Sequence, residues 1–445
     1  MFINRDKLIL EDGINYKLLS SLIKQWQSKE LPRLKKLGEE YNRQMSDDII
    51  INHAKYITDT ITNFVFGKAV QYINGNSELY VENMVLIDED SHNNILGKHQ
   101  SIYGCGFEYI FINEEDMIDL AVLSPLNTIV IYSNDIIPKP IMGVYITENL
   151  DEEGAVESYN ILAYTDTYVV EYQGKEIDKC VVTRLEPHYF GKVPILECKN
   201  NEEKKGDFED LIGLIHSYED LQANRVFDKK QFVEKLLVIT NSSLGDTLEE
   251  FEMSKQILKE GGILELESSD GANASAQFIS QTFNEDQVET LKKAILDDIF
   301  RMARIPNLSD EAFGNTTSGI SLKYKLFGTE TLASEKERQF KRTLRERLAI
   351  VNNIYTLKGG KMELSDVDIT MIRNIPTSKE EALSELQATE GILSLATRIA
   401  RYDSEINVEE EIARLQEEKQ FNMNLVSQQF GNYEYGSEEE DIEEE

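Results

Sequence analysis

The chain contains few of the residues used for disulfide bonds or membrane insertion. Its 445 residues include three cysteines, Cys105, Cys180 and Cys198, which are scattered and show no CxxC spacing. A disulfide framework usually has an even number of cysteines at regular spacings, so these three predict reduced thiols of a cytosolic protein. No run approaches the roughly 18 apolar residues of a membrane span, and the first residues lack the apolar core of a signal peptide. We therefore expect a soluble protein that does not contact a membrane.

Motifs for ATP hydrolysis, acyl transfer and metal binding are also lacking. Four Gly-Lys pairs occur, but none has the earlier glycine of a Walker A loop, and GxSxG is absent. The five histidines show no HxxxH or HExxH spacing, and we interpret His92 and His99 as surface residues of one loop. Cys105, in the segment GCGF, is interpreted as a small buried residue of a β-turn. We expect no catalytic residues, no metal site and no cofactor.

Positive charge is scarce, because 46 lysines and arginines stand against 81 aspartates and glutamates and leave a net charge of −35. The last thirteen residues hold eight of these carboxylates, too few to explain the excess. Such a balance favours solubility and repels DNA at long range. Because a specific DNA-binding protein is normally basic, we expect any nucleic acid to be contacted locally and weakly, or to move past the protein.

The pattern of apolar residues predicts an α+β protein. Residues 15–43 have helical spacing, with a short break before a second helix that begins at Pro32. Residues 50–66 repeat the helical pattern, which ends at Gly67. Between 68 and 197, short β-branched and aromatic runs alternate with turn residues. These runs predict a mostly β, antiparallel domain.

A helical hairpin is predicted after this β domain. Residues 208–237 have the apolar spacing of one long helix, and residues 285–304 have that of a second helix, which ends before Pro306. The residues between them, 237–283, form short β-like runs. One helix therefore leads out to a small β subdomain, and the second returns beside the first.

A long basic helix follows a polar loop of Gly, Ser, Thr and Asn at 308–319. Residues 323–358 contain nine lysines and arginines against four glutamates. The predicted apolar face consists of Phe340, Leu344, Leu348, Val351 and Tyr355. We predict a kink at Gly328, since glycine weakens helix interiors. The cations could offset negative charge near DNA or pair with carboxylates of a neighbouring subunit, and the residues alone favour neither.

The C-terminal part is predicted to be helical. A strand-like segment at 362–372 precedes a helix start capped by Thr377 or Ser378, and helices continue to about residue 429. The acidic residues 433–445 are expected to be disordered.

Four sequence blocks, in this order, resemble the portal proteins of tailed bacteriophages, in the family typified by siphophages of Gram-positive hosts. The resemblance covers roughly residues 30 to 425. The matching positions are Asn52, Lys55, Ile57, Asp59, Phe66, Gly67 and Tyr72; Gly104, Gly106 and Tyr109; His188, Phe190, Gly191, Pro194, Asn200, Gly206, Asp207, Tyr218 and Asp220; and Pro306, Gly314, Ser318, Gly319, Leu322 and Lys323.

The resemblance implies a portal-protein fold with a mixed α/β wing, a helical-hairpin stem, a small α/β clip, a long kinked helix and a helical crown. The implied boundaries are 1–206 for the wing, 207–237 and 284–305 for the stem helices, 238–283 for the clip, 306–319 for the tunnel loop, 320–376 for the kinked helix and a returning strand, 377–432 for the crown, and 433–445 for the acidic tail.

The resemblance also implies a structural role without catalysis. The family forms a ring, usually dodecameric, at one capsid vertex of the virion, with double-stranded DNA passing through it non-specifically during packaging and ejection. Implied partners are the terminase large subunit, a head-completion or adaptor protein, the scaffold and the major capsid protein, with assembly in the host cytoplasm. The alternatives are another head–tail connector or capsid-associated protein and, from a different class, a carboxylate-based nuclease or glycosidase.

Two sets of residues are implied to face the DNA channel. Hydroxyls and amides of the tunnel loop would contact phosphates, and such contacts carry no base information. The tunnel-loop candidates are Phe313, Gly314, Asn315, Thr316, Thr317 and Ser318. The candidates on the basic helix are Lys323, Lys325, Lys341, Arg342 and Arg345.

Overall fold

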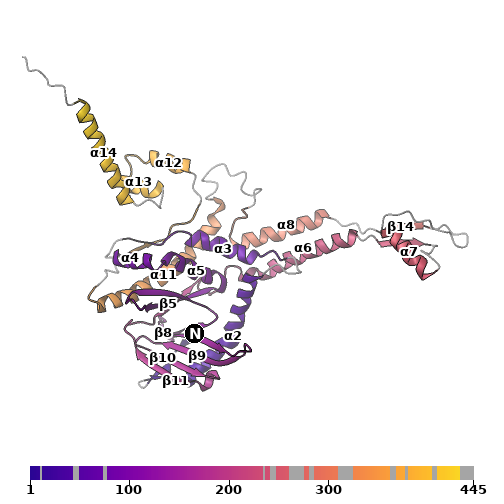
Figure 1. The fold of residues 1–445 in the computed structure, drawn as a ribbon, viewed down its shortest axis with the longest axis horizontal. Helices are drawn as coiled ribbons and strands as arrows, with labels where there is room; N and C mark the ends of the chain where they lie inside the picture. The colour runs from indigo at the N-terminus through magenta and orange to yellow at the C-terminus, as the bar shows by residue number, and fades with distance from the viewer. Residues whose placement is uncertain are drawn as a thin grey trace, which may run out of the picture. The chain divides into compact units, whose positions relative to one another are not determined.

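The computed structural model describes residues 1–10, 13–43, 50–73, 78–233, 236–240, 247–259, 275–279, 285–308, 324–360, 367–375, 379–402 and 408–430. The chain divides into two compact units, Met1–Asn374 and a second that begins at Ile375 (Figure 1).

The helices are α1 (Arg5–Leu8), α2 (Tyr16–Asn42), α3 (His53–Phe66), α4 (Glu78–Leu86), α5 (Glu89–Tyr103), α6 (Ile212–Val233), α7 (Leu248–Lys259), α8 (Glu285–Ala303), α11 (Phe327–Leu357), α12 (Lys379–Ala388), α13 (Leu395–Tyr402) and α14 (Val408–Phe430). The strands are β1 (Phe2–Ile3), β2 (Ile9–Leu10), β3 (Gly13–Ile14), β4 (Gln71–Ile73), β5 (Cys105–Ile112), β6 (Ile118–Leu123), β7 (Thr128–Ser133), β8 (Pro140–Leu150), β9 (Val156–Tyr164), β10 (Tyr168–Gly174), β11 (Val181–Pro187), β12 (Ile195–Lys199), β13 (Leu236–Thr240), β14 (Ser275–Ile279) and β15 (Asp368–Thr370). This mixture confirms the predicted α+β class.

Two sheets organise the N-terminal part of the first unit. The larger has the order β1-β7-β8-β9-β10-β11, and every pair in it is antiparallel except the short parallel pair of β1 and β7. The smaller has the order β12-β5-β6 and is antiparallel throughout. The predicted β domain is thus confirmed beyond residue 104. It is wrong for residues 78–86 and 89–103, which form α4 and α5, because a β-branched or aromatic run such as 79–81 also fits a buried helix.

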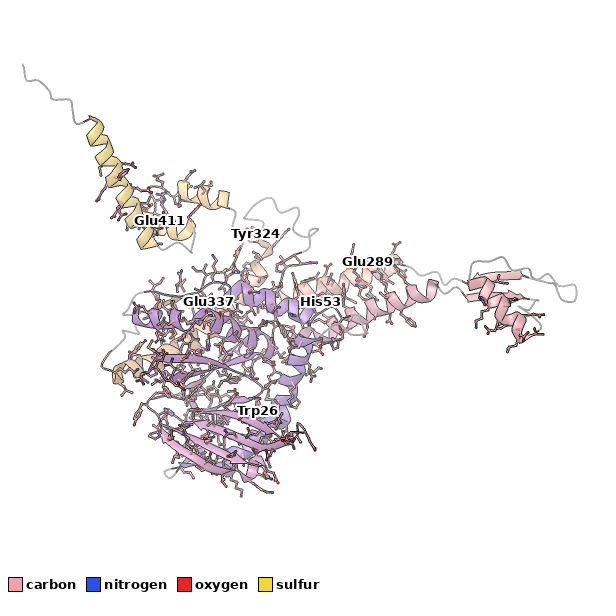
Figure 2. All side chains as sticks on the ribbon, in the orientation of Figure 1. Trp26, His53, Glu289, Tyr324, Glu337 and Glu411 are labelled. Atoms are coloured by element: carbon pink, nitrogen blue, oxygen red, sulfur yellow. The ribbon has the colours of Figure 1, made fainter. Side chains whose placement is uncertain are left out.

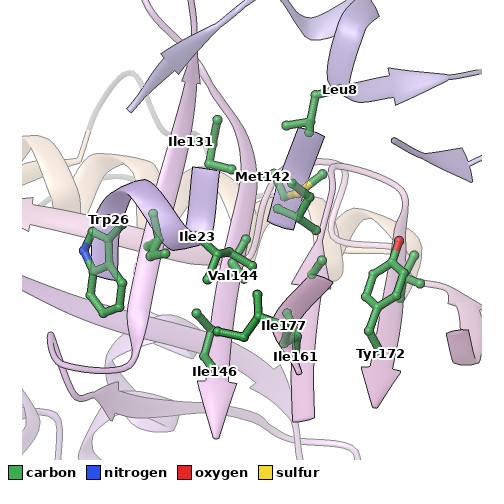
Figure 3. Packing of buried hydrophobic residues seen from close by; sticks show 14 of the residues in the cluster. Leu8, Ile23, Trp26, Ile131, Met142, Val144, Ile146, Ile161, Tyr172 and Ile177 are labelled. Carbon is green, nitrogen blue, oxygen red and sulfur yellow. The ribbon is translucent and has the colours of Figure 1, made fainter. Parts of the chain in front are cut away.

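One hydrophobic core of the described residues lies between α2 and the six-stranded sheet. Leu19, Ile23 and Trp26 of α2 belong to one buried cluster with Val144 and Ile161 of the sheet (Figure 3). These α2 residues recur at spacings of three and four, the pattern of a helix that buries one stripe.

The predicted break at Pro32 is wrong, because α2 continues through it to Asn42. Trp26 and Leu34, on either side of the proline, are both buried in the same core. A proline inside a helix removes one backbone hydrogen bond and costs about 3 kcal/mol. Burial of apolar side chains before and after Pro32 offsets this cost and keeps both turns in one helix.

The helix α11 packs on the other elements of the first unit. The rings of Phe340 on α11 and Phe66 on α3 lie 4.6 Å apart between centroids. Residues 324–325 are helical, residue 326 forms a turn and α11 begins at Phe327, so the helix is interrupted two residues before Gly328, close to the predicted kink. The strand-like segment that follows is confirmed as β15, which pairs with β4.

The predicted helical hairpin consists of α6 and α8, which run side by side (Figure 1). Arg225 on α6 bonds to Glu289 on α8 at 3.0 Å and also contacts Glu285. The first helix ends earlier than predicted, at Val233, because Leu236 already belongs to β13, which pairs with β14.

One helix between these strands was missed, because residues 248–259 form α7 instead of a β-like run. Its start has a signal that the sequence offered: Thr247 and Glu250 exchange backbone-to-side-chain hydrogen bonds of 3.3 and 3.4 Å. This is the reciprocal capping of a Thr-x-x-Glu motif.

The second unit contains α12, α13 and α14 and confirms the predicted helical character of the C-terminal part. The predicted caps Thr377 and Ser378 and the acidic residues 433–445 lie outside the described residues.

Candidate functional site

The structure describes only part of the predicted channel site. The tunnel-loop candidates 313–318 and Lys323 lie outside the described residues. Lys325 is an exposed side chain just before α11, and Lys341, Arg342 and Arg345 lie on α11 itself. The described part of the site therefore consists of α11 and the elements that pack against it.

An apolar stripe fixes the orientation of α11. Phe340, Leu344, Leu348 and Val351 are buried as predicted, whereas Tyr355 is half-buried. The spacing of three and four places these residues on one side of the helix. Because the stripe fixes which side of α11 faces the core, some of the lysines and arginines of this helix lie in the protein interior and others lie on its surface.

Two cations of α11 are buried inside the protein, which the sequence analysis missed. Lys336 is fully buried, and its Nζ lies 2.7 Å from Oδ2 of Asp207 and 2.5 Å from Oδ1 of Asn200. Asp207 also accepts a hydrogen bond from Oγ of Ser101 on α5. Lys336 therefore ties α11 to the segment that precedes α6.

The second buried cation, Arg347, is fully buried and binds two carboxylates. Its Nη2 lies 2.6 Å from Oε2 of Glu108, its Nη1 lies 2.5 Å from Oε1 of Glu89, and Asn93 accepts a further bond at 2.9 Å. Burial by itself raises the pKa of Glu108. The guanidinium of Arg347 and the hydrogen bonds from Arg347 and His92 outweigh burial and lower this pKa to about 2. The carboxylate is therefore ionised, and the pair holds α11 against α5 and β5.

Lys341, one of the predicted channel cations, is paired within the chain. Its Nζ lies 2.6 Å from Oε1 of Glu337, and Nη2 of Arg373 lies 2.5 Å from the other oxygen of the same carboxylate. Burial raises the pKa of Glu337, but the two cations lower it below its usual value. Figure 2 shows Glu337 on α11, among the other elements of the first unit. The charge of Lys341 is thus largely compensated.

The exposed cations of α11 form one row. Arg338, Arg342 and Arg345 follow one another at spacings of four and three residues, so they lie on one face of the helix, and all three are exposed. In the described part of the chain, Arg342 and Arg345 form no ion pair. We call these three residues the arginine row.

A cavity of about 230 Å³ lies beside the arginine row, between the end of β7, β12 and α11. We call it the β7–α11 pocket. Its lining includes Tyr132, Ile137, Lys139, Lys199, Arg342 and Glu346. Ile137, which lies in the loop that follows β7, is an exposed apolar side chain of this lining.

The charge of the β7–α11 pocket is positive. Of its two carboxylates, Glu197 lies 2.5 Å from Nζ of Lys204, and Glu346 lies 2.7 Å from Nζ of Lys192. Within the described ranges, Lys139, Lys199 and Arg342 have no carboxylate partner. Arg342 was predicted, but Lys139 and Lys199 come from distant segments without a sequence signal.

The structure places His92, His99 and Cys105 in other elements than the sequence predicted. His92 and His99 both lie on α5, so the predicted surface loop is wrong. His92 is buried, with Nε2 3.0 Å from Oε2 of Glu108, and His99 is half-buried. Cys105 is buried as predicted, but it opens β5 instead of lying in a turn. Burial raises the pKa of its thiol to about 12.

Over the part of the chain that the structure describes, no group of three or more His, Cys, Asp and Glu residues is arranged to hold a metal ion. Among the same residues, no helix has the length and apolar content needed to cross a membrane.

Comparison with known proteins adds two sequence matches and one structural match. The family model described as phage portal protein, SPP1 Gp6-like, matches residues 15–424. The portal protein of Bacillus phage SPP1 is 25% identical over 420 residues, which cover 88% of this chain and 80% of that protein. A solved chain from the neck of an empty GTA particle, computed with C6 symmetry, is 12% identical with a TM-score of 0.41, and the match covers 84% of this chain and 94% of that chain.

Proposed function

The chain belongs to the SPP1 Gp6-like family of phage portal proteins, and from this membership we propose that twelve copies form a closed ring around a DNA channel at the capsid vertex. The ring is a conduit for double-stranded DNA during packaging and ejection and the attachment point between head and tail. The observation that carries the proposal is the family match over residues 15–424, which includes both α6–α8 and α11.

Exposed apolar residues on the α6–α8 hairpin support self-assembly. Phe227 and Val226 on α6 and Leu291 and Met302 on α8 are all more than one third exposed. Large exposed apolar surfaces usually mark protein contacts. In the ring, these side chains pack against the hairpin of the next subunit.

Each part of the chain receives a role from the family. We assign the wing to 1–206, the stem to 207–237 and 284–305, and the clip to 238–283. The tunnel loop is 306–319, the long helix with its strand is 320–376, and the crown is 377–432. The clip is the docking site for the terminase large subunit during filling and for a head-completion or adaptor protein afterwards. Scaffold and major capsid protein surround the ring during assembly, which takes place in the host cytoplasm.

The charge of the chain suits passage of DNA without tight binding. Cationic contacts to many phosphates bind DNA strongly and resist movement. A net charge of −35 per chain instead repels the duplex and keeps it centred. In this proposal the tunnel loop and the exposed cations near it supply a few weak, sequence-independent contacts.

The protein has no catalytic activity of its own in this proposal. The paired cations of α11 stabilise the fold instead of activating a nucleophile or a water molecule. Another head–tail connector remains the related alternative, and a carboxylate-based nuclease or glycosidase is the alternative from a different class.

A phage with an early stop codon in the gene for this chain tests the conduit function. We expect heads that contain no packaged DNA and carry no tail, with both defects repaired by supplying the chain in trans. DNA-filled, tailed particles formed without the chain would contradict the proposal. Incubation of the purified chain with duplex DNA and Mg²⁺ tests the nuclease alternative. We expect the DNA to stay intact, whereas a nuclease would cleave it.

A further inference from the structure

The two ends of strand β8 carry surfaces of opposite charge. The strand runs for 11 residues, from Pro140 to Leu150, which is about 35 Å at the usual rise per residue. The β7–α11 pocket lies at its Pro140 end. The hairpin that joins β8 to β9 lies at the other end, and we call residues 148–157 the acidic tip.

The acidic tip combines carboxylates with exposed apolar side chains. Its carboxylates are Glu148, Asp151, Glu152, Glu153 and Glu157, and all five residues are exposed. In the described residues none of them forms a salt bridge. Leu150 and Val156 beside them are 58% and 41% exposed.

The backbone of the acidic tip is ordered by its own hydrogen bonds. Oδ1 of Asp151 accepts from the backbone N–H groups of Glu153 and Ala155 at 3.0 and 2.8 Å, and the N–H of Gly154 donates to the carbonyl of Asp151 at 3.1 Å. Asp151 therefore shapes the turn, while Glu152 and Glu153 point their charge outward without a partner among the described residues. A preformed turn loses little conformational entropy when it docks.

The β7–α11 pocket has the complementary character. Lys139, Lys199 and Arg342 supply positive charge, while Ile137, which is 71% exposed, and Pro138 supply apolar surface. A surface of this kind fits a segment with both carboxylates and apolar side chains. A DNA backbone offers phosphates but no matching apolar groups, so the apolar part of the lining favours a protein partner.

One chain cannot bring the two surfaces together, because they lie at opposite ends of the same strand. A second copy can. We propose that the acidic tip of one subunit docks in the β7–α11 pocket of the next subunit, a contact that rests on the proposed ring. Because the two surfaces differ, the contact is heterologous, and a heterologous contact generates a ring when the rotation between neighbouring subunits closes.

The contact sets the order and register of the subunits. Exposed ion pairs contribute only about 0–1 kcal/mol each, so the charges alone do not hold the ring. Their main effect is to exclude wrong pairings, because placing two acidic tips or two pockets together repels. Burial of Leu150 and Val156 against Ile137 adds an apolar contribution.

Charge reversal on each side tests the contact. One variant carries Glu152→Lys and Glu153→Lys, and the other carries Lys139→Glu and Arg342→Glu. We expect each variant alone to lower the ring fraction in sedimentation velocity at least tenfold relative to the unmodified chain. An equimolar mixture should restore rings, because every contact in an alternating ring then pairs opposite charges.

A matched control reverses two carboxylates at another turn. Glu114 and Glu115 are exposed in the turn between β5 and β6, so Glu114→Lys with Glu115→Lys makes the same change of charge away from the contact. We expect this control to form rings as the unmodified chain does. Circular dichroism confirms that all variants are folded.

The outcomes separate this inference from the ring itself. If the unmodified chain forms rings and the two reversed variants form them equally well, the contact is refuted and the ring remains. Failure of the mixture to restore rings also refutes the contact. If the Lys139→Glu, Arg342→Glu variant forms rings but loses binding to duplex DNA in a filter assay, the pocket contacts phosphates and the inference is overturned. If the unmodified chain never forms rings, both proposals fall.

Discussion

Arg347 and Glu108 lie 239 residues apart in the chain, yet both side chains are fully buried and Nη2 of one lies 2.6 Å from Oε2 of the other. The pair joins α11 to β5. Lys336 and Asp207 make a second buried link from the same helix. α11 is therefore fixed to the rest of the first unit at two points, and the arginine row occupies a defined position on the surface.

Removal of Arg347 is expected to destabilise the protein strongly. Arg347→Ala leaves Glu108 and Glu89 buried without their cation, and breaking a buried pair in this way costs about 3–5 kcal/mol. Arg345→Ala, two residues away on the exposed face, should change the stability by less than about 0.5 kcal/mol. Urea unfolding followed by circular dichroism compares the two midpoints. Equal midpoints would show that the buried pair contributes no stability.

The pH dependence of stability should reflect Glu108. Its pKa is about 2 in the folded protein against an ordinary value of 4.5, so the folded state holds the ionised form more favourably. The resulting stabilisation, on the order of 3 kcal/mol, is fully present above pH 4.5 and is lost as the pH falls toward 2. The variant Glu108→Gln has no carboxylate at this position that could be protonated. Its urea midpoint should therefore fall less steeply between pH 5 and pH 2 than that of the unmodified chain. Parallel curves for the two proteins would refute this assignment.

Gly104 should not tolerate a side chain. Its φ of 81° is in the left-handed region, and an added Cβ would lie 2.0 Å from the carbonyl oxygen of Lys204. Gly104→Ala is expected to lower the free energy of unfolding by about 1–3 kcal/mol. The change is measured as a lower thermal midpoint. Gly213→Ala on α6 is the control, because nothing lies within 4 Å of the added Cβ there and the midpoint should stay unchanged or rise slightly. An unchanged midpoint for Gly104→Ala would contradict the close approach of Lys204 to this glycine.

Cys105 and Cys198 should be unreactive in the folded protein. Both thiols are buried, and burial raises the pKa of each to about 12, so almost no thiolate is present at pH 8. Alkylation with iodoacetamide followed by mass spectrometry of the peptides should label neither residue in the native chain and both after denaturation. Rapid labelling of Cys198 in the native chain would contradict its burial.

Local patterns predicted much of the fold. Apolar spacing identified α3 and the buried face of α11 at Phe340 and Leu344, because those residues face a core at each helical turn. It also identified α8, although Leu291 and Met302 of that helix stay exposed. Pro32 and the run at 79–81 misled the prediction. In both cases packing outweighed the local preference, since buried neighbours hold α2 and α4 in helical form.

The charged groups around α11 were less predictable. The sequence showed that the helix is basic, but it did not show that Lys336 and Arg347 are buried while Arg342 and Arg345 are exposed. Their partners Asp207 and Glu108 lie more than 100 residues away, and no periodic pattern connects them. The family resemblance, by contrast, was carried by four blocks of sequence and is confirmed by the match over residues 15–424.

Electron microscopy of the purified chain tests the central claim most directly. We expect class averages of closed rings with about a dozen lobes and a central channel wide enough for a DNA duplex. The presence of the open channel is decisive, whatever the number of lobes. Compact monomers at every concentration and salt condition would contradict the account.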